Sequence, residues 1–325
     1  MTVRLDGTID SIAKAVDIVR DLRRDSMVTR PKGWPFHKFP FGVWFRGQPQ
    51  LGLPLVPRVH RDHRIVDGKT RFGGWDETNI FEHLKVRAPG YQATYRTAFD
   101  WLCLMQHYSV PTRLLDWSEY ILPALYFAVK DDLREAGELI VLNARRLNPP
   151  GARLPSIFPP GEGQVVIRAE MAWTRRASKL RHKHTVVEAL AEEAIEASER
   201  DWLVRFCTPI PVFPSRLNDR MVFQSSVFTL HGGKCYPGRM RQYYGRDAMP
   251  EPVTLEDIER DRGPAERILK RYEIPRKAKR PILDSLFLLG IHEATLFPEV
   301  DRQAVYLEDL WWHAKRRAGA RRHFP

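Results

Sequence analysis

The polar block QHYSVPTRLLDWS, residues 106–118, constrains the fold more than any other part of the sequence, because it runs directly into an apolar helix. Pro111 ends the helical pattern before it and favours a short strand or turn. From 119 to 134 apolar residues recur at helical spacing and are expected to point inward: Ile121, Ala124, Leu125, Ala128 and Val129. Polar groups at such a junction must pair with one another or face a ligand, and strand-to-helix junctions readily bind anions.

Two further polar clusters interrupt apolar elements. The run VWF at 43–45 predicts a short strand, and RGQ at 46–48 predicts a turn after it. The run MVFQSSVFTL at 221–230 predicts a strand with FQSS as its polar middle. The permanent cation of Arg46 either satisfies a structural carboxylate or binds an anion. The three clusters therefore either pair with one another or converge on one ligand site.

Helical and strand patterns alternate along the rest of the chain. Together they predict an α+β fold in which helices wrap a small mixed or antiparallel sheet that is split across a cleft. Helical patterns cover 10–24, 78–108, 183–200, most of 254–280 and a last helix that Asp301 can cap, and a strand is expected at 138–142. The segment 49–76 shows no periodicity, and a loop of that length is usually functional or mobile.

Composition excludes several classes of protein. The 325 residues are 43% apolar, which is typical of a globular chain with a substantial core. No run of about 18 apolar residues occurs, and the first ten residues lack the apolar block of a signal peptide, so no membrane association is expected. Cys103, Cys207 and Cys235 are far apart, which indicates a reducing, cytoplasmic location. No zinc-ligand spacing, P-loop, Rossmann or nucleophile-elbow motif is present, so we expect no metal.

The charge of the chain favours polyanionic partners. The formal net charge is +12 and the isoelectric point is about 9.7, a balance that suits nucleic acid. Nine Lys or Arg residues lie between 260 and 280. The tail WWHAKRRAGARRHF, residues 311–324, combines tryptophans with basic residues, as phosphate contact with base stacking requires. The alternative for this tail is an amphipathic closing helix with its tryptophans in the core.

The polar clusters together resemble the FRG domain family, which is named for a Phe/Tyr-Arg-Gly motif. The resemblance rests on FRGQ (45–48), QHYSVPTRLLDWSEYILPALYFA (106–128), RMVFQSSVFTLHG (220–232) and GIHEATLFPEVD (290–301), in the family's order and spacing. It implies one domain over 1–325, with an N-terminal helix and loop at 1–40, a core at 41–240 and a basic helical region at 241–325. Ser109 replaces the Gly that usually follows His-Tyr, and Gln224, Ser225 and Ser226 stand where the family usually has Gln-Gln-Gly.

The same clusters are also similar to the three motifs of Arg-Ser-Glu ADP-ribosyltransferases, in the same order. The strand ending in FRG at 45–47 is similar to their first motif, DWS and the helix after it (116–127) to their second, and 224–228 to their Glu-x-Glu strand. The resemblance implies an ADP-ribosyltransferase-like split sheet and a cleft that binds NAD as substrate. The residues expected to contact the nucleotide are Arg46, Gly47, Gln48, Tyr108, Thr112, Arg113, Trp117, Gln224 and Phe228.

Each role follows from the chemistry of NAD. Arg46 would pair with phosphate and the backbone of Gly47 with the nicotinamide amide. Tyr108 or Trp117 could stack on the nicotinamide ring, and Ser118 would orient the ribose or Arg46. A carboxylate would stabilise the cation that develops at ribose C1′ as nicotinamide leaves.

The catalytic glutamate of those transferases has no counterpart, because Ser226 occupies its position. Asp116 is the first candidate to replace it and Glu293 the second. Asp116 could instead be a buried salt-bridge partner for Arg46 or Arg113. His107 is a further catalytic candidate, with the alternative that it is a helix-end residue favoured by the helix dipole.

Three functions remain open on the sequence. The first is an ADP-ribosyltransferase-like protein that transfers ADP-ribose or cleaves NAD, as a toxin or defence effector against phage. The second is a non-catalytic module that binds nucleotide or nucleic acid through a basic surface. The third is a protein-interaction scaffold that kept the fold without the reaction. Arg46, Asp116 and Ser118 in one cleft would favour the first, and their pairing inside the core would favour the third.

Overall fold

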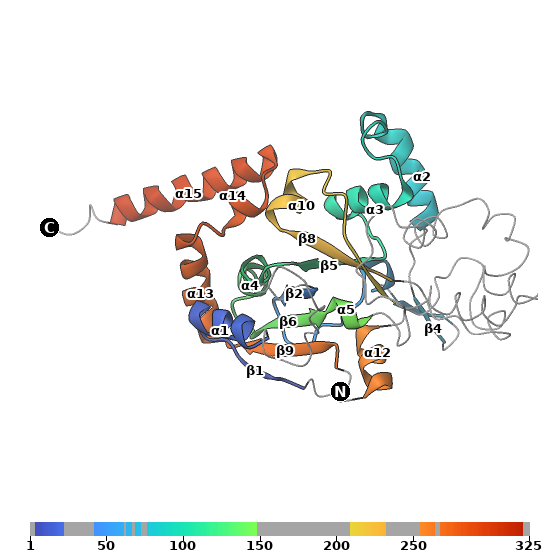
Figure 1. Ribbon diagram of the computed structural model, residues 1–325. Helices are drawn as coiled ribbons and strands as arrows, with labels where there is room; N and C mark the ends of the chain where they lie inside the picture. The colour runs from blue at the N-terminus through green and yellow to red at the C-terminus, as the bar shows by residue number, and fades with distance from the viewer. Residues whose placement is uncertain are drawn as a thin grey trace, which may run out of the picture.

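The fold is built on a seven-strand mixed sheet with the order β1-β9-β6-β2-β5-β8-β7 (Figure 1). The computed structural model describes residues 4–22, 42–61, 63–66, 69–72, 77–147, 209–231, 254–263 and 267–320. The strands of the sheet are β1 (Gly7–Thr8), β2 (Val43–Gln48), β5 (Leu114–Ser118), β6 (Gly137–Asn143), β7 (Ile210–Val212), β8 (Ser226–Leu230) and β9 (Leu269–Ile274). The predicted α+β class is confirmed.

The sheet is much more weakly joined at one place than elsewhere. β1 and β9 run parallel, and the other neighbouring strands are antiparallel. β2 is in register with β6 over all of Val43–Gln48, whereas β2 and β5 share one register pair, Phe45 with Ser118. The strands on the two sides of this pair therefore separate, and the backbone of β2 beyond Phe45 is paired on the β6 side alone.

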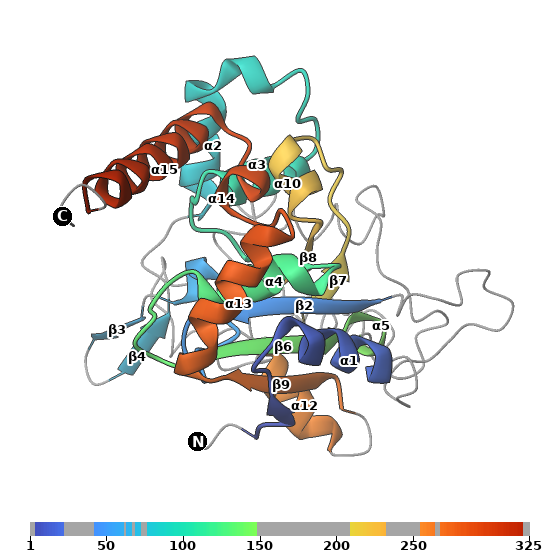
Figure 2. The ribbon, with the colours of Figure 1, turned by 90° about the vertical axis from the view of Figure 1, so that its left-hand side faces the viewer.

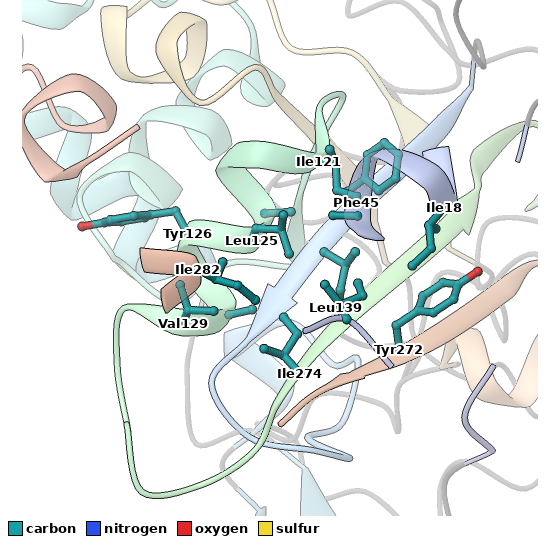
Figure 3. Packing of buried hydrophobic residues seen from close by; sticks show 14 of the residues in the cluster. Ile18, Phe45, Ile121, Leu125, Tyr126, Val129, Leu139, Tyr272, Ile274 and Ile282 are labelled. Atoms are coloured by element: carbon teal, nitrogen blue, oxygen red, sulfur yellow. The ribbon is translucent and has the colours of Figure 1, made fainter. Parts of the chain in front are cut away.

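Three helices cover one face of the sheet. α1 (Ile12–Leu22), α4 (Ile121–Val129) and α13 (Arg276–Leu288) lie on the left of the sheet in Figure 1 and in front of it in Figure 2. Their apolar side chains pack on Phe45, Leu139 and Ile274, as Figure 3 shows. This burial of apolar surface is the main force that holds the three helices to the sheet.

The opposite face is covered by α5 (Ala144–Leu147) and α12 (Leu255–Arg262), which pack with Trp44, Trp117 and Ile140. A third apolar cluster lies between β7, β8, α3 (Ala98–His107) and α10 (Asp219–Phe223). Thr97 and Asp100 form a capping box that begins α3, and Thr254 and Asp257 form another that begins α12.

Gly47 sets how closely α4 approaches the sheet. A Cβ at this position would lie 1.8 Å from the carbonyl oxygen of Ala124 and 2.6 Å from the nitrogen of Ala128. No side chain fits there, so the glycine lets the backbone of the helix rest directly on β2. The structure thus gives a packing reason for the glycine of the FRG triplet.

Four local predictions are corrected. The strand β2 continues through Gln48, so RGQ is not a turn, because the whole run pairs with β6. The expected strand 221–230 is α10 followed by β8, and the change occurs at Ser225, whose φ is 49°. The expected helix 78–108 is divided into α2 (Glu77–Arg87), the 3₁₀ turn η2 (Pro89–Tyr91) and α3. β9 interrupts the expected helical stretch 254–280. The predicted helix 183–200 lies outside the described residues.

The remaining elements lie at the periphery. β3 (His63–Val66) and β4 (Lys69–Phe72) form a separate hairpin after the 3₁₀ turn η1 (Arg58–His60). α14 (Glu293–Leu296) leads into α15 (Val300–Ala320), which projects past the other labelled elements in Figure 1. Trp311 is 66% exposed, so the alternative that placed it in the core is wrong. None of the helices in the described part of the chain has the length and apolar composition needed to cross a membrane.

Candidate functional site

A cleft of about 340 Å³ opens where β2 and β5 separate. Its walls come from β2, β5, α4, α10 and the segment 58–61. Five cations line it, and two carboxylates, those of Asp116 and Asp131. The cations are Arg46, Arg58, Arg61, Lys130 and Arg220. The described lining therefore carries an excess of positive charge, which favours an anionic ligand.

Arg46 is the most buried of these cations, with 16% of its side chain exposed. Its Nη1 donates a hydrogen bond of 2.7 Å to the backbone oxygen of Asp116, and the Asp116 carboxylate is 4.0 Å away. Its Nε is buried and has no hydrogen-bond partner among the residues that the structure describes. Burial lowers the pKa of Arg46 to about 10, and the charge of Asp116 opposes that shift. The group is thus charged at neutral pH and incompletely paired, which is costly unless an anion joins it.

The carboxylate of Asp116 is hydrogen-bonded to Gln106, and its side chain lines the cleft. Its Oδ2 accepts a hydrogen bond of 2.7 Å from Nε2 of Gln106. Oγ1 of Thr112 donates to Oε1 of Gln106 at 2.5 Å and accepts from the backbone nitrogen of Leu114 at 3.1 Å. This relay fixes the Gln106 amide so that its NH₂ group faces the carboxylate. Because 55% of the Asp116 side chain is exposed, the residue does not form a buried ion pair with Arg46.

Two serines on the neighbouring strands β5 and β8 line the cleft. Ser118 and Ser226 are in register. Oγ of Ser118 donates to the backbone oxygen of Gln224 at 2.9 Å and accepts from the backbone nitrogen of Tyr120 at 3.2 Å. Ser118 therefore joins β5 to the turn before β8. The Gln224 amide also lines the cleft and donates to the backbone oxygen of Leu296 at 3.0 Å.

Arg220 connects the cleft to a cluster behind it. It donates to the backbone oxygen of His107 at 3.1 Å and lies 4.5 Å from the ring centroid of Phe297. Nε2 of His107 is 3.3 Å from Oε1 of Glu299, which is also 3.9 Å from Arg220. Burial, followed by the charge of Arg220, lowers the pKa of His107, and Glu299 opposes the shift. His107 does not line the cleft, so its imidazole contacts this cluster instead.

The structure brings together some of the predicted site residues. Arg46, Gly47, Asp116, Trp117, Ser118 and Gln224 all line the cleft. Thr112 lies behind Gln106, and Phe228 is buried in the cluster beside α3. Gln48 is buried, and its Oε1 has no hydrogen-bond partner within the described ranges.

The other predicted residues lie away from the cleft lining. The Tyr108 side chain is exposed, and its hydrogen bond to Tyr91, 2.7 Å long, raises its pKa to about 12. Glu293 begins α14 and lies 3.7 Å from Arg302. The backbone oxygen of Arg113 accepts from His231 at 3.0 Å.

The sequence analysis missed several residues that line the cleft: Arg58, Arg61, Gln106, Lys130, Asp131 and Arg220. Two signals could have found part of this set. Arg58 and Arg61 fall in the long aperiodic segment 49–76, which was expected to be functional or mobile. Gln106 is the first residue of the polar block, and Arg220 is the first residue of the RMVFQSS motif. Their convergence depends on tertiary structure and is not visible as local spacing. Among the described residues, no group of His, Cys, Asp and Glu is placed to hold a metal ion.

Comparison with known proteins identifies the domain that contains most of this site. Residues 42–137 match the family model of the FRG domain, so the chain contains an FRG domain, as the motifs predicted. The matched region includes β2, α3, β5 and α4, which supply Arg46, Gln106 and Asp116. Searches of curated proteins and of solved structures found no match to the chain.

Proposed function

We propose that the cleft of this FRG-domain protein binds NAD or a related nucleotide, with Arg46 facing a phosphate. The observation that carries the proposal is the state of Arg46. It is a nearly buried cation for which the described part of the chain offers no partner to Nε and no carboxylate closer than that of Asp116, 4.0 Å away. A phosphate oxygen at this position would complete its hydrogen bonding and neutralise its charge.

The rest of the lining suits a diphosphate. Five cations against two carboxylates leave an excess of three positive charges in the described lining. A dinucleotide brings two phosphate charges into that field. The volume of about 340 Å³ lies within the range of small-molecule pockets, and Trp117 and Phe127 add aromatic surface to the wall.

The position of Asp116 supports ADP-ribosyl chemistry in the same cleft. In that reaction the bond between ribose C1′ and the nicotinamide nitrogen breaks, and its electron pair neutralises the pyridinium. A hydroxyl of water or of an acceptor adds to C1′ and loses its proton. Asp116 would stabilise the developing cation and take this proton, which Ser226 cannot do because it has no charge. Such an activity, which consumes NAD, fits a toxin or defence effector.

Positioning by Gln106 would matter for that role. Its amide holds one carboxylate oxygen of Asp116 and leaves the other available, and Thr112 fixes the amide's orientation. Without Gln106 the exposed carboxylate could rotate away from C1′. We therefore infer that Gln106 is a positioning residue for Asp116.

The nucleic-acid alternative depends on the basic surface, and contacts within the fold occupy three of the nine basic residues at 260–280. Arg267 pairs with Asp6 and Glu259, and Arg271 pairs with Glu138. Lys279 is fully buried. These three groups stabilise the fold and are not available to phosphates, whereas Arg276, Lys277 and Arg280 of the same cluster are exposed.

Calorimetric titration with NAD tests the proposal. We expect saturable heat for the wild type, none for Arg46→Ala, and unchanged heat for Arg20→Ala. Arg20 is a matched control because it is an exposed cation on α1, paired with Asp17 and remote from the cleft lining. The same thermal unfolding midpoint for all three proteins would show that the loss is local. Absence of heat at millimolar NAD in the wild type would overturn the nucleotide proposal.

Nicotinamide release then separates binding from catalysis. Asp116→Asn should bind NAD and lose about 100- to 1000-fold in rate, the usual cost of removing one preorganised electrostatic group. Gln106→Leu should lower kcat with little change in KM, and Gln106→Glu should not rescue it because a carboxylate repels Asp116. If the wild type binds NAD but releases no nicotinamide, the protein is a nucleotide-binding module and the hypothesis of catalysis is excluded.

A further inference from the structure

The helix α15 carries an apolar stripe that nothing in the described part of the chain covers. Val300 is 85% exposed, Leu307 50% and Trp311 66%, and Ala304 between them is also exposed. An isolated exposed apolar residue needs no explanation, but a contiguous row on a projecting helix marks an interaction surface.

The spacing of the stripe is that of a coiled coil. Apolar residues recur at alternating steps of four and three residues along α15, from residue 300 to residue 318. The members are Val300, Ala304, Leu307, Trp311, Ala314 and Ala318. Such a repeat keeps one seam facing a partner helix over its whole length. The 21 residues of α15 make a rod about 32 Å long, which corresponds to three heptads.

The charges of α15 indicate which partner fits. Residues 300–310 contain three acidic residues and one basic residue, a net charge of −2, whereas 311–320 contain Lys315, Arg316 and Arg317 and no acidic residue. An antiparallel copy of the same helix brings each half against its opposite. A parallel copy would place like charges together, which disfavours it.

We propose that two copies of this chain associate through antiparallel pairing of their α15 helices about a two-fold axis near residue 309. In this register Leu307 of one copy lies opposite Trp311 of the other, Val300 opposite Ala318, and Ala304 opposite Ala314. Each apolar position thus meets another, and the acidic Asp301 meets the basic Arg317. The interface is isologous and closed, so it makes a dimer and not a fibre.

Sedimentation equilibrium of the 325-residue chain tests the dimer. We expect a mass that rises with concentration toward twice 37.9 kDa. Leu307→Glu should return it to the single-chain mass, a twofold drop, because two buried carboxylates would face the partner's seam. Val86→Glu is the matched control, since Val86 is 75% exposed on α2, and it should leave the dimer unchanged. A single-chain mass at every concentration, or a dimer that persists in Leu307→Glu, would overturn the proposal.

A charge swap tests the antiparallel register itself. Asp301→Lys and Arg317→Glu should each weaken the dimer, and the double variant should restore it, because the two positions exchange partners across the axis. If Arg317→Glu leaves the mass unchanged but abolishes retention on single-stranded DNA, the helix serves nucleic acid and the self-pairing proposal fails.

Discussion

Arg46 and Arg271 occupy the same row of the same face of the sheet, separated by Ile140, yet their surroundings are opposite. Arg46 on β2 is in register with Ile140 on β6, which is in register with Arg271 on β9. Arg271 donates to Glu138 at 2.9 Å and also to Glu256. Arg46 donates to the backbone oxygen of Asp116, and the carboxylate of Asp116 lies 4.0 Å from it.

The difference between the two arginines distinguishes a cation that stabilises the fold from one that is a candidate for binding a ligand. On the β9 side every strong contact of the buried cation is made within the fold, and Glu138 is fully buried with it. On the β5 side the strands separate and the cation lines a cleft, while its buried Nε has no hydrogen-bond partner among the described residues. A buried group that is fully paired stabilises the fold, whereas one left incomplete is a candidate for binding.

The largest effect on stability is expected at the paired site. Arg271→Leu should lower the free energy of unfolding by about 3–5 kcal/mol, because it leaves the carboxylate of Glu138 buried without its partner. Urea unfolding measures this loss. Arg20→Ala, at an exposed pair, should cost about 0–1 kcal/mol and serves as the control. If Arg271→Leu costs as little as Arg20→Ala, the two regions do not differ in the way proposed here.

The opposite face of β2 offers the next test. Gly47→Ala should destabilise the protein by about 1–3 kcal/mol, because its Cβ would overlap the backbone of α4. Gly90→Ala is the matched control, since a Cβ at Gly90 meets nothing within 4 Å, and should change stability by less than about 0.5 kcal/mol. Thermal unfolding of both variants decides whether Gly47 is retained for packing. Equal midpoints would indicate that α4 can shift and that the glycine serves the cleft.

The buried histidine His60 is expected to make the stability of the protein depend on pH. His60 is 2% exposed, and neither ring nitrogen has a hydrogen-bond partner in the described part of the chain. Burial, followed by the charge of Arg113, lowers its pKa to about 3. The unfolded chain, with a histidine pKa near 6.5, therefore binds one more proton between these values. Stability should fall as the pH drops below about 6.5, by up to ~1.4 kcal/mol per pH unit.

In the window from about pH 6.5 to 5 the carboxylates remain ionised, so the slope comes from the histidines whose pKa burial lowers, which are His60, His107 and His292. Urea unfolding of His60→Leu should show a shallower dependence on pH than the wild type. His83→Leu is the control, since His83 is an exposed histidine on α2. An unchanged slope in His60→Leu would show that His60 is not held neutral.

Several strands and helices could be predicted from the sequence, because local patterns of residues determine them. The bulky run at 43–45, the strand at 138–142 and the helical patterns at 10–24 and 119–134 follow from local sequence alone. Arg46, Asp116 and Ser118, which the FRG motifs contain, line one cleft together.

What could not be predicted depends on tertiary contacts. RGQ has the composition of a turn, but pairing with β6 along the whole of β2 overrides that local preference. The run 221–230 is apolar enough for a strand, yet Asn218 caps a helix before it and Ser225 adopts a positive φ. Arg58, Arg61 and Arg220 reach one cleft from distant segments, and no spacing in the sequence records that convergence.

The smallest stability effect is expected at Arg46, and it decides between the two interpretations of the cleft. Arg46→Leu loses one hydrogen bond to Asp116 but also removes a buried, incompletely paired charge, so the two terms should cancel to within about 1 kcal/mol. The increase in unfolding midpoint that NAD gives the wild type should disappear, since a ligand stabilises only the state that binds it. If Arg46→Leu instead costs as much as Arg271→Leu, Arg46 is a structural cation like its neighbour. In that case the open cleft is a consequence of the splayed strands and is not a binding site.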